Sequence, residues 1–391
     1  MVTLLKNSII FFIGSSIALV LSEISLRIID FSYPSLYRPN DTTWTEHYPN
    51  AEGWHSAEGN TYIKINSHGL YNPEITILKP KDTVRIAVLG DSFAEAFQVP
   101  MEKTFWSILQ SELNKCKPFG DKKIQVINFG VSGYGTGQEL IRLRTRVWKY
   151  EPDIILLTFY AGNDIRNNSS TLEGNHPTLK GNKTKPYFTL KNNNLTLDNS
   201  FRNSKVYKQK RSPFWKSILF ASQYSRVLQL IKKARHALYN YGNNYAEDFS
   251  NPVFFPPKNK SMSEAWSITE KIILSMKNEV QQKNSIFFLV TLSIDYQVLP
   301  DKKVIKHLME DVGLTNRFYP DERMEAFAKK NQFPYLILAP TFAHHAQKHG
   351  IFLHGPEKNS KQKGIGHWNA NGHRLGGQLM AREICNNTLS Q

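Results

Sequence analysis

The sequence predicts an α/β fold with a doubly wound parallel sheet, an N-terminal transmembrane helix and a basic insertion. Apolar runs of strand length alternate with segments of helical spacing, which is typical of a parallel sheet covered by helices. An uncharged apolar run lies near the N-terminus. Between residues 166 and 260 the alternation stops, and most of the excess positive charge lies there.

The N-terminal apolar run, Asn7–Ser22, is flanked by Lys6 and Glu23. As a helix it would be about 24 Å long, which is shorter than the ~30 Å hydrocarbon core of a bilayer. Snorkelling of Lys6 and extension through the apolar residues up to Ile28 make up the difference. We therefore predict a signal-anchor transmembrane helix within residues 1–30.

A cleaved signal peptide is the alternative interpretation of this run. It requires a small-x-small cleavage site after the apolar stretch, and the best pair, Ser16 and Ala18, falls inside the stretch. The N-terminal amine and Lys6 outweigh the charge on the other side, which favours a cytoplasmic N-terminus. We expect a single-pass protein, in contact with the membrane through this helix, whose body is extracytoplasmic or periplasmic.

Residues 31–80 are expected to form an irregular N-terminal extension with short strands, one of them at Thr61–Ile65. Continuous apolar runs then predict buried parallel strands, and helical spacing predicts the helices between them. The expected strands are Val84–Gly90, Ile124–Phe129, Asp153–Phe159, Ile286–Leu292 and Tyr335–Leu338. The expected helices are 105–113, 138–148, 263–282, 323–330 and 371–385. Residues 81–391 would thus form one domain, which the basic insertion at about 166–260 interrupts.

The insertion accounts for most of the net charge of +16. Residues 166–260 hold 17 Lys and Arg against 4 Asp and Glu, a net charge of +13. A solvated insertion, a surface for anionic lipid or polysaccharide, and a nucleic-acid patch would each explain such a composition. Because no nucleic-acid module pattern is present, we expect no nucleic-acid partner.

Two elements are expected inside the insertion. A hairpin is predicted around Tyr187–Leu190 and Leu195–Leu197. Ser212 and Pro213 begin a predicted helix whose apolar stripe continues to Ile231 and whose end is basic. Such a helix either packs on its own protein, which is the more common case, or lies on a membrane surface.

A candidate nucleophile follows the first buried strand, in the tripeptide Gly90-Asp91-Ser92. This position places Ser92 at the carboxyl end of a parallel strand, where open α/β sheets have their sites. At a helix N-terminus, the backbone N–H of a serine and the helix dipole both stabilise an oxyanion. The alternative is that Asp91 and Ser92 only cap a helix.

Three further segments follow the other strands or precede the last helix. Gly133 ends the segment Asn128–Gly133, where its amide can face the same crevice, and a tight turn is the alternative explanation. Asn163 follows the third strand and offers a side-chain amide, unless it only caps a turn. His367 stands before the last helix. A serine nucleophile needs such a base within hydrogen-bond reach, and the pKa of histidine suits this role near neutral pH.

The ordered set Gly90-Asp91-Ser92, Gly133, Gly162-Asn163-Asp164 and His367-Trp-Asn resembles the SGNH/GDSL hydrolase superfamily. The resemblance covers about residues 84–164 and 263–387. It implies a flavodoxin-like sheet, Ser92 as nucleophile, His367 as general base, and an oxyanion hole formed by the amides of Ser92 and Gly133 with the Asn163 side chain. It implies no metal or cofactor, and an acyl ester, expected to be an O-acetyl ester of a small molecule or glycan, as substrate.

The sequence departs from the family pattern before the histidine. The family usually has Asp three residues before the base, and that position is Gly364 here. A dyad, a backbone carbonyl that orients the imidazole, or an acid from elsewhere in the chain would each answer this departure. His373 is a second candidate base, although it falls on the predicted helix, where a packed or capping histidine is expected.

The resemblance also bears on the two cysteines, Cys116 and Cys385. In the strand order that the family implies, the helices that end at these residues are neighbours on one face of the sheet, so we predict a disulfide. His345 and His349 are four residues apart, but without the Glu of the zinc-protease motif we interpret them as surface histidines.

Two other functions are compatible with the sequence. The first is an O-acyltransferase or deacetylase that modifies a cell-surface polysaccharide, because transfer and hydrolysis share the acyl-serine intermediate. The second is a catalytically weak or inactive glycan-binding protein with this fold, for which Gly364 is the only support.

Overall fold

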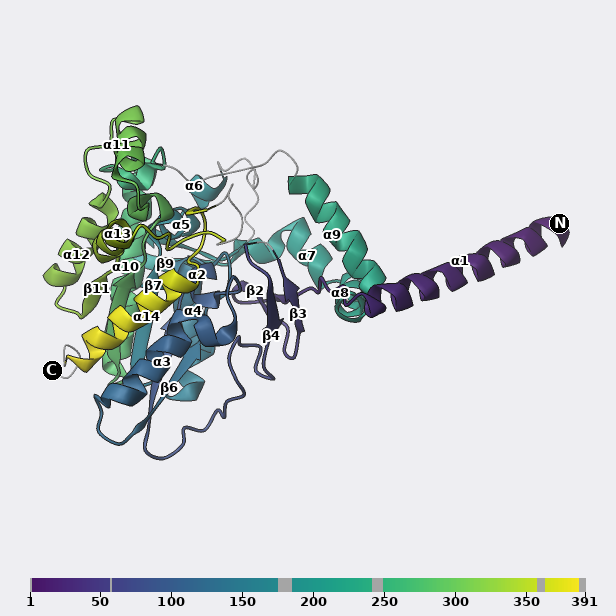
Figure 1. Ribbon diagram of the computed structural model, residues 1–391, viewed down its shortest axis with the longest axis horizontal. Coiled ribbons are helices and arrows are strands. Elements are labelled where there is room, and N and C mark those ends of the chain that lie inside the picture. Colours follow the sequence, from purple (N-terminus) through teal and green to yellow (C-terminus); the bar gives the residue numbers. More distant parts are fainter. Residues whose placement is uncertain (1, 57, 175–184, 241–248, 357–362, 387–391) are drawn as a thin grey trace.

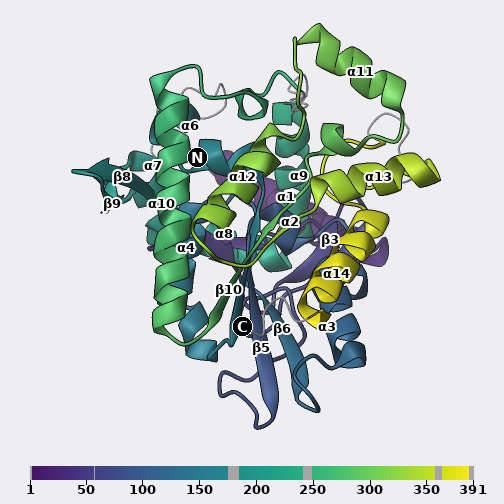
Figure 2. The same ribbon diagram turned by 90° about the vertical axis from the view of Figure 1, so that its left-hand side faces the viewer.

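The computed structural model describes residues 2–56, 58–174, 185–240, 249–356 and 363–386. Its centre is a parallel sheet of order β11-β10-β7-β5-β6 (Figures 1 and 2). The strands are β5 (Thr83–Leu89), β6 (Lys123–Asn128), β7 (Ile154–Phe159), β10 (Ile286–Thr291) and β11 (Tyr335–Ile337). This is the flavodoxin-like order. All five strands are parallel, and the side on which successive strands are added switches between β5 and β7. The predicted doubly wound parallel sheet is therefore confirmed.

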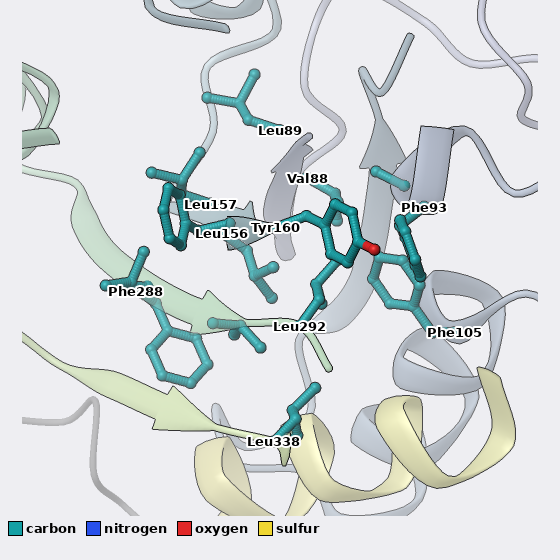
Figure 3. Close-up of a cluster of buried hydrophobic side chains, with 14 of the residues drawn as sticks. Val88, Leu89, Phe93, Phe105, Leu156, Leu157, Tyr160, Phe288, Leu292 and Leu338 are labelled. Carbon is teal, nitrogen blue, oxygen red and sulfur yellow. The ribbon is translucent and has the colours of Figure 1, made fainter. Parts of the chain in front are cut away.

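The strands are apolar because helices cover both of their faces. Every residue of β5 and β7 is buried. Figure 3 shows Val88, Leu89, Leu156, Leu157 and Phe288 from three adjacent strands in one hydrophobic cluster. Strands buried on both faces lack alternation, which is why continuous apolar runs predicted them.

Helices α3 (Phe105–Cys116) and α14 (Ala370–Cys385) lie on one face of the sheet, and α4 (Thr136–Thr145) and α10 (Lys260–Gln282) lie on the other (Figure 2). Gly377 permits the close approach of α14 to α3, since a Cβ there would lie 2.6 Å from the carbonyl oxygen of Phe105. The remaining helices of the domain are α2 (Ser92–Glu95), α5 (Ala161–Asn167), α6 (Ser170–Gly174), α11 (Lys302–Asp311), α12 (Tyr319–Lys330) and α13 (Ala339–His349). Of these, α5, α6, α11 and α13 were not predicted.

The predicted disulfide is confirmed. Cys116 ends α3, Cys385 ends α14, and the two are bonded with their Cα atoms 6.2 Å apart. The bond closes a loop that spans a sequence separation of 269 residues. A cross-link over so long a loop mainly restricts the unfolded chain.

Replacing both cysteines by serine is expected to lower the free energy of unfolding by about 2–5 kcal/mol. Chemical denaturation of the oxidised protein and of the Cys116→Ser/Cys385→Ser variant measures the difference. A reductant should destabilise the parent protein and leave the variant unaffected. Equal midpoints for the oxidised parent and the variant would contradict the prediction.

The extension before the sheet is more regular than predicted. It contains two antiparallel pairs, β1 (Tyr37–Asn40) with β2 (Trp44–His47), and β3 (Glu52–His55) with β4 (Thr61–Lys64). The expected strand at Thr61–Ile65 is thus present as β4, and the other three short strands were not located from the sequence. These strands are four residues long and of mixed polarity, so they produce no clear periodic pattern.

Inside the insertion, the predicted hairpin is present as β8 (Tyr187–Lys191) and β9 (Asn194–Asp198). The single long helix predicted from Ser212 is wrong, because Ser225 separates α8 (Pro213–Tyr224) from α9 (Arg226–Asn240). Ser212 does cap α8, accepting a hydrogen bond from the Trp215 amide. The insertion also holds α7 (Lys205–Arg211), while its residues 175–184 and 241–248 lie outside the described part of the chain.

The first helix, α1 (Val2–Ile28), projects away from the domain (Figure 1). Its large apolar side chains are exposed, among them Phe11, Phe12 and Leu21. Residues Thr3–Ile28 are long and apolar enough to cross a membrane, although a signal sequence would meet the same criteria.

Candidate active site

Ser92 occupies the sharp turn from β5 into α2. Asp91 caps this helix, since its side chain accepts a hydrogen bond from the amide of Phe93. Gly90 is required just before it, because a Cβ at that position would overlap the hydroxyl oxygen of Thr158. The turn therefore holds Ser92 at the carboxyl end of β5, beside the point where the strand order reverses.

The hydroxyl of Ser92 is the first member of a three-residue hydrogen-bonded chain. Its Oγ lies 2.7 Å from Nε2 of His367. On the other side of the imidazole, Nδ1 lies 2.8 Å from Oε1 of Glu58. The second carboxylate oxygen of Glu58 accepts a hydrogen bond from the backbone amide of His367 at 2.9 Å. Such a chain can move a proton from the hydroxyl to the imidazole while the carboxylate orients the ring.

Glu58 is the acid that faces His367, in place of the Asp that the family usually has at the position of Gly364. The acid that faces the histidine comes from the N-terminal extension, between β3 and β4, and not from the segment before the histidine. No local pattern marked Glu58, because it lies 309 residues from its partner and in a segment without helical or strand periodicity. With the acid supplied, Gly364 no longer indicates an inactive protein.

Two glycines before the histidine explain why the acid arrives from elsewhere. Gly364 has φ +85°, and a Cβ there would lie 2.5 Å from Cδ1 of Phe352, so an Asp would be strained and crowded. Gly366 has φ +99°, and a Cβ there would lie 2.7 Å from Oε2 of Glu58. The backbone at Gly366 thus leaves the space that the Glu58 carboxylate occupies.

The loop that holds His367 is tied to the end of β10. Asp295 accepts a hydrogen bond from the Gly366 amide at 2.8 Å. The imidazole of His354 bonds to the Gly366 carbonyl at 2.7 Å and to Ser293 at 2.9 Å. These bonds restrict the position of the base relative to Ser92.

His373, the second candidate base, lies away from Ser92. Its imidazole is fully buried, stacks on the ring of Phe105 and accepts a hydrogen bond from the Phe105 amide at 3.3 Å. Burial lowers the pKa of His373 to about 3, so the ring is neutral at physiological pH. It is a packed, capping histidine.

The electrostatics of His367 and Glu58 favour a protonated imidazole beside an ionised carboxylate. Burial works against a charged imidazole, but the hydrogen bond and the negative charge of Glu58 outweigh it and raise the pKa of His367. Burial likewise opposes ionisation of Glu58, yet its bonds to His367 keep the pKa of this carboxyl below its ordinary value. An imidazolium formed during a reaction would therefore be stabilised where it forms.

The groups expected to stabilise an oxyanion have N–H donors to which no acceptor is assigned among the described residues. Within the described residues, no hydrogen-bond acceptor is assigned to the backbone amide of Ser92 or of Gly133. Asn163 donates one N–H of its side-chain amide to Asp91 at 2.8 Å, which leaves the second N–H for a ligand. Gly133 sits with φ +76° in the loop after β6.

The loop of Gly133 is attached to the helix of the candidate nucleophile through Glu95. This carboxylate accepts a hydrogen bond from the Ser132 amide at 2.9 Å, next to Gly133. It also pairs with buried His47 at 2.7 Å and accepts a hydrogen bond from the Tyr37 hydroxyl at 2.7 Å. The N-terminal extension therefore supports both the acid and the loop of Gly133, a role that the sequence did not reveal.

A cavity of about 650 Å³ opens beside Asn163 and His367. Phe93, Tyr160, Ile165, Val253, Met262 and Ile365 make much of its wall apolar, and Asn251 adds a polar group. The end of the insertion contributes to this wall, and Asn251 donates a hydrogen bond to the Gly162 carbonyl beside Asn163. The size is that of a small-molecule site.

No cluster of three potential metal ligands occurs among the described residues. His345 and His349 lie one helical turn apart on α13, with ring centroids 4.6 Å apart, and are partly or fully exposed. The expectation that neither metal nor cofactor takes part remains a prediction.

Comparisons with known proteins returned no matching family model. A curated arylesterase from Vibrio mimicus is 33% identical over 82 residues, which is 21% of this chain and 39% of that protein. The chain thus spans less than half the length of this relative.

Solved structures returned by the comparison include an acetylxylan esterase from Geobacillus stearothermophilus (12% identity, TM-score 0.37, 77% of this chain and 94% of that chain). A GDSL-like lipase from Bacteroides thetaiotaomicron has 12% identity and a TM-score of 0.33, over 80% of this chain and 93% of that one.

Proposed function

We propose that this chain is a membrane-anchored serine ester hydrolase of the SGNH/GDSL type, which acts through an acyl-serine intermediate. The main support is the hydrogen-bonded chain from Ser92 through His367 to Glu58. A serine hydroxyl is a weak nucleophile unless a base takes its proton. The distances that join these three side chains meet this requirement.

In the first half of the reaction, Oγ of Ser92 attacks the ester carbonyl carbon, and Nε2 of His367 takes the hydroxyl proton. The amides of Ser92 and Gly133 and the Asn163 side chain stabilise the negative carbonyl oxygen. The intermediate collapses, the bond to the alcohol oxygen breaks, and His367 returns its proton to the departing alcohol. Glu58 orients the ring throughout and stabilises its charged form.

In the second half, a water molecule attacks the acyl-serine. His367 accepts a proton from that water, and the same donors stabilise the second oxyanion. Collapse breaks the bond between the acyl carbon and Oγ of Ser92, and His367 returns the proton to Ser92. The products are a carboxylic acid and free enzyme, so neither metal nor cofactor is needed.

A fluorophosphonate probe tests the central claim. Folded protein is expected to be labelled at Ser92, because the probe reacts with activated serines, whereas protein unfolded beforehand should not react. Mass spectrometry of the digested protein would locate the label. If the folded protein stays unlabelled, or if the label lies on a different serine, the proposal is wrong.

The contribution of Asn163 can be measured separately. Asn163→Ala is expected to lower kcat about 10²- to 10³-fold with a smaller change in KM, because the lost N–H acts mainly on the oxyanion. Asn331→Ala, at the end of α12 by the opposite edge of the sheet, should retain parental kinetics. An Asn163→Ala variant with parental kcat would exclude this side chain from the oxyanion hole.

The substrate is proposed to be a short acyl ester, expected to be O-acetyl, of a small molecule or glycan. The cavity beside His367 is larger than an acetyl group requires, which leaves room for a sugar-sized alcohol. Transfer of the acyl group to a cell-surface polysaccharide is the second candidate, because the end of the basic insertion borders this cavity. If added glycan acceptor does not accelerate release of p-nitrophenol from p-nitrophenyl acetate, transfer is disfavoured.

The proposed location rests on α1. As a single-pass anchor, this helix would hold the domain at the extracytoplasmic or periplasmic face of a membrane, as the charge distribution around it favours. Extraction of the full chain by detergent, but not by high salt or carbonate, would support the anchor.

A further inference from the structure

The helices α8 and α9 of the insertion pack beside the domain end of the projecting helix α1 (Figure 1). The Glu23 carboxylate on α1 accepts hydrogen bonds from the backbone amides of Arg226 and Val227, at 3.0 and 3.1 Å. Glu23 therefore caps the N-terminus of α9. Arg27 donates a hydrogen bond to the carbonyl of Tyr224, at the end of α8, at 2.7 Å. The turn between α8 and α9 therefore has a defined position at the domain end of α1.

The same two helices are held to the domain. The buried side chain of Gln229 accepts a hydrogen bond from the Tyr33 amide at 2.8 Å. Lys232 donates to the carbonyl of Pro34 at 2.8 Å. Because α8 and α9 are attached both to α1 and to the segment that leads into the domain, their orientation relative to both is fixed.

Despite these attachments, large apolar side chains remain exposed on α8 and α9. Phe220 is 59% exposed, Ile231 59% and Leu238 79%. Lys216 and Arg235 are exposed on the same helices, and the sequence from Pro213 to Asn240 has no acidic residue. We call these residues the basal surface: Lys216, Phe220 and Tyr224 of α8, and Ile231, Arg235 and Leu238 of α9.

We infer that the basal surface lies in the interface of the membrane that α1 enters, with its apolar side chains among the lipids and its basic side chains at anionic head groups. Continuity with α1 supports a bilayer as the occupant, since Leu19 and Val20 of α1 line a largely apolar groove together with Tyr224 and Leu228 of the insertion. Apolar and basic residues without acidic ones are typical of helices that bind anionic bilayers.

This inference rests on the proposed anchoring by α1. It goes beyond anchoring because it predicts a second contact, which prevents rotation of the domain about a single helix. The carboxyl ends of the strands would then keep one orientation relative to the lipid surface. The structure thus assigns to part of the basic insertion a role that is separate from the cavity wall.

The test uses the full chain in phosphatidylcholine vesicles with and without phosphatidylglycerol. Phe220→Cys is labelled with an environment-sensitive fluorophore, which is selective because both native cysteines are disulfide-bonded. Quenching by nitroxide lipids should be severalfold stronger than for the same label at Val304→Cys, an exposed position on α11. In the Phe220→Cys background, reversing the charge of Lys216 and Arg235 should weaken quenching in phosphatidylglycerol vesicles.

Several results would overturn the inference. They are equal quenching at the two positions, failure of the protein to float with the vesicles, and a label at Phe220 that is shielded from water but not quenched, which would indicate a protein partner. Quenching that does not respond to charge reversal would overturn the role of anionic lipid. Hydrolysis of p-nitrophenyl acetate in the same samples reports separately on the proposed catalytic function.

Discussion

Replacing Ser92 by alanine is expected to lower kcat for p-nitrophenyl acetate by about 10⁴-fold or more, and to leave folding intact. The alanine lacks the hydroxyl oxygen that lies 2.7 Å from His367 Nε2, so no acyl-serine can form. Only the oxyanion donors and binding would contribute to the remaining rate. Initial rates at saturating substrate, together with fluorophosphonate labelling, measure the effect.

Ser111→Ala is the matched control, because Ser111 is exposed on α3, the helix that follows the candidate nucleophile. It should keep parental activity and labelling. Circular dichroism and thermal melting should show both variants folded. A Ser92→Ala variant that retains most of the parental rate would mean that another residue attacks the ester.

Glu58→Gln is expected to reduce kcat by up to about 10⁴-fold, since an amide neither holds the imidazole in the same tautomer nor stabilises its charged form. The second readout is the pH profile. Glu58 raises the pKa of His367, and catalysis needs the neutral imidazole, so activity falls as the pH drops through this raised pKa. Without the carboxylate the pKa of His367 falls, and the acidic limb of kcat/KM should move to lower pH.

Glu52→Gln is the control for this second variant, because Glu52 is an exposed carboxylate on β3 of the same extension. Its rate and pH profile should match those of the parent. A Glu58→Gln variant that loses activity without a shift of the acidic limb would indicate that Glu58 only supports the loop. Parental activity in Glu58→Gln would favour a serine–histidine dyad.

The dependence of the site on the N-terminal extension follows from these contacts. Glu58 reaches His367, and His47 and Tyr37 hold the Glu95 carboxylate that positions the loop of Gly133. The extension is therefore part of the proposed catalytic unit, although none of the four sequence blocks lies in it. Shortening the chain to the start of β5 would remove the acid together with this support.

The sequence alone predicted the α/β sheet and the succession of its strands and helices along the chain. Buried strands such as Thr83–Leu89 produce continuous apolar runs, and caps such as Ser212 are visible within a few residues. Ser92 and Asn163 were identified as candidate site residues because they follow such strands closely. Parallel strands bring their carboxyl ends to one edge of the sheet. This information is local, so it can be read from short windows of sequence.

Only the tertiary structure identified Glu58 as the partner of His367, 309 residues away in the chain. It also showed that an acid at Gly364 would be disfavoured, because the backbone there has φ +85° and the side chain of Phe352 lies close. The break between α8 and α9 has a similar origin, since the carboxylate that caps α9 belongs to α1. In each case the deciding contact joins distant segments, and neither segment contains a periodic or compositional sign of its partner.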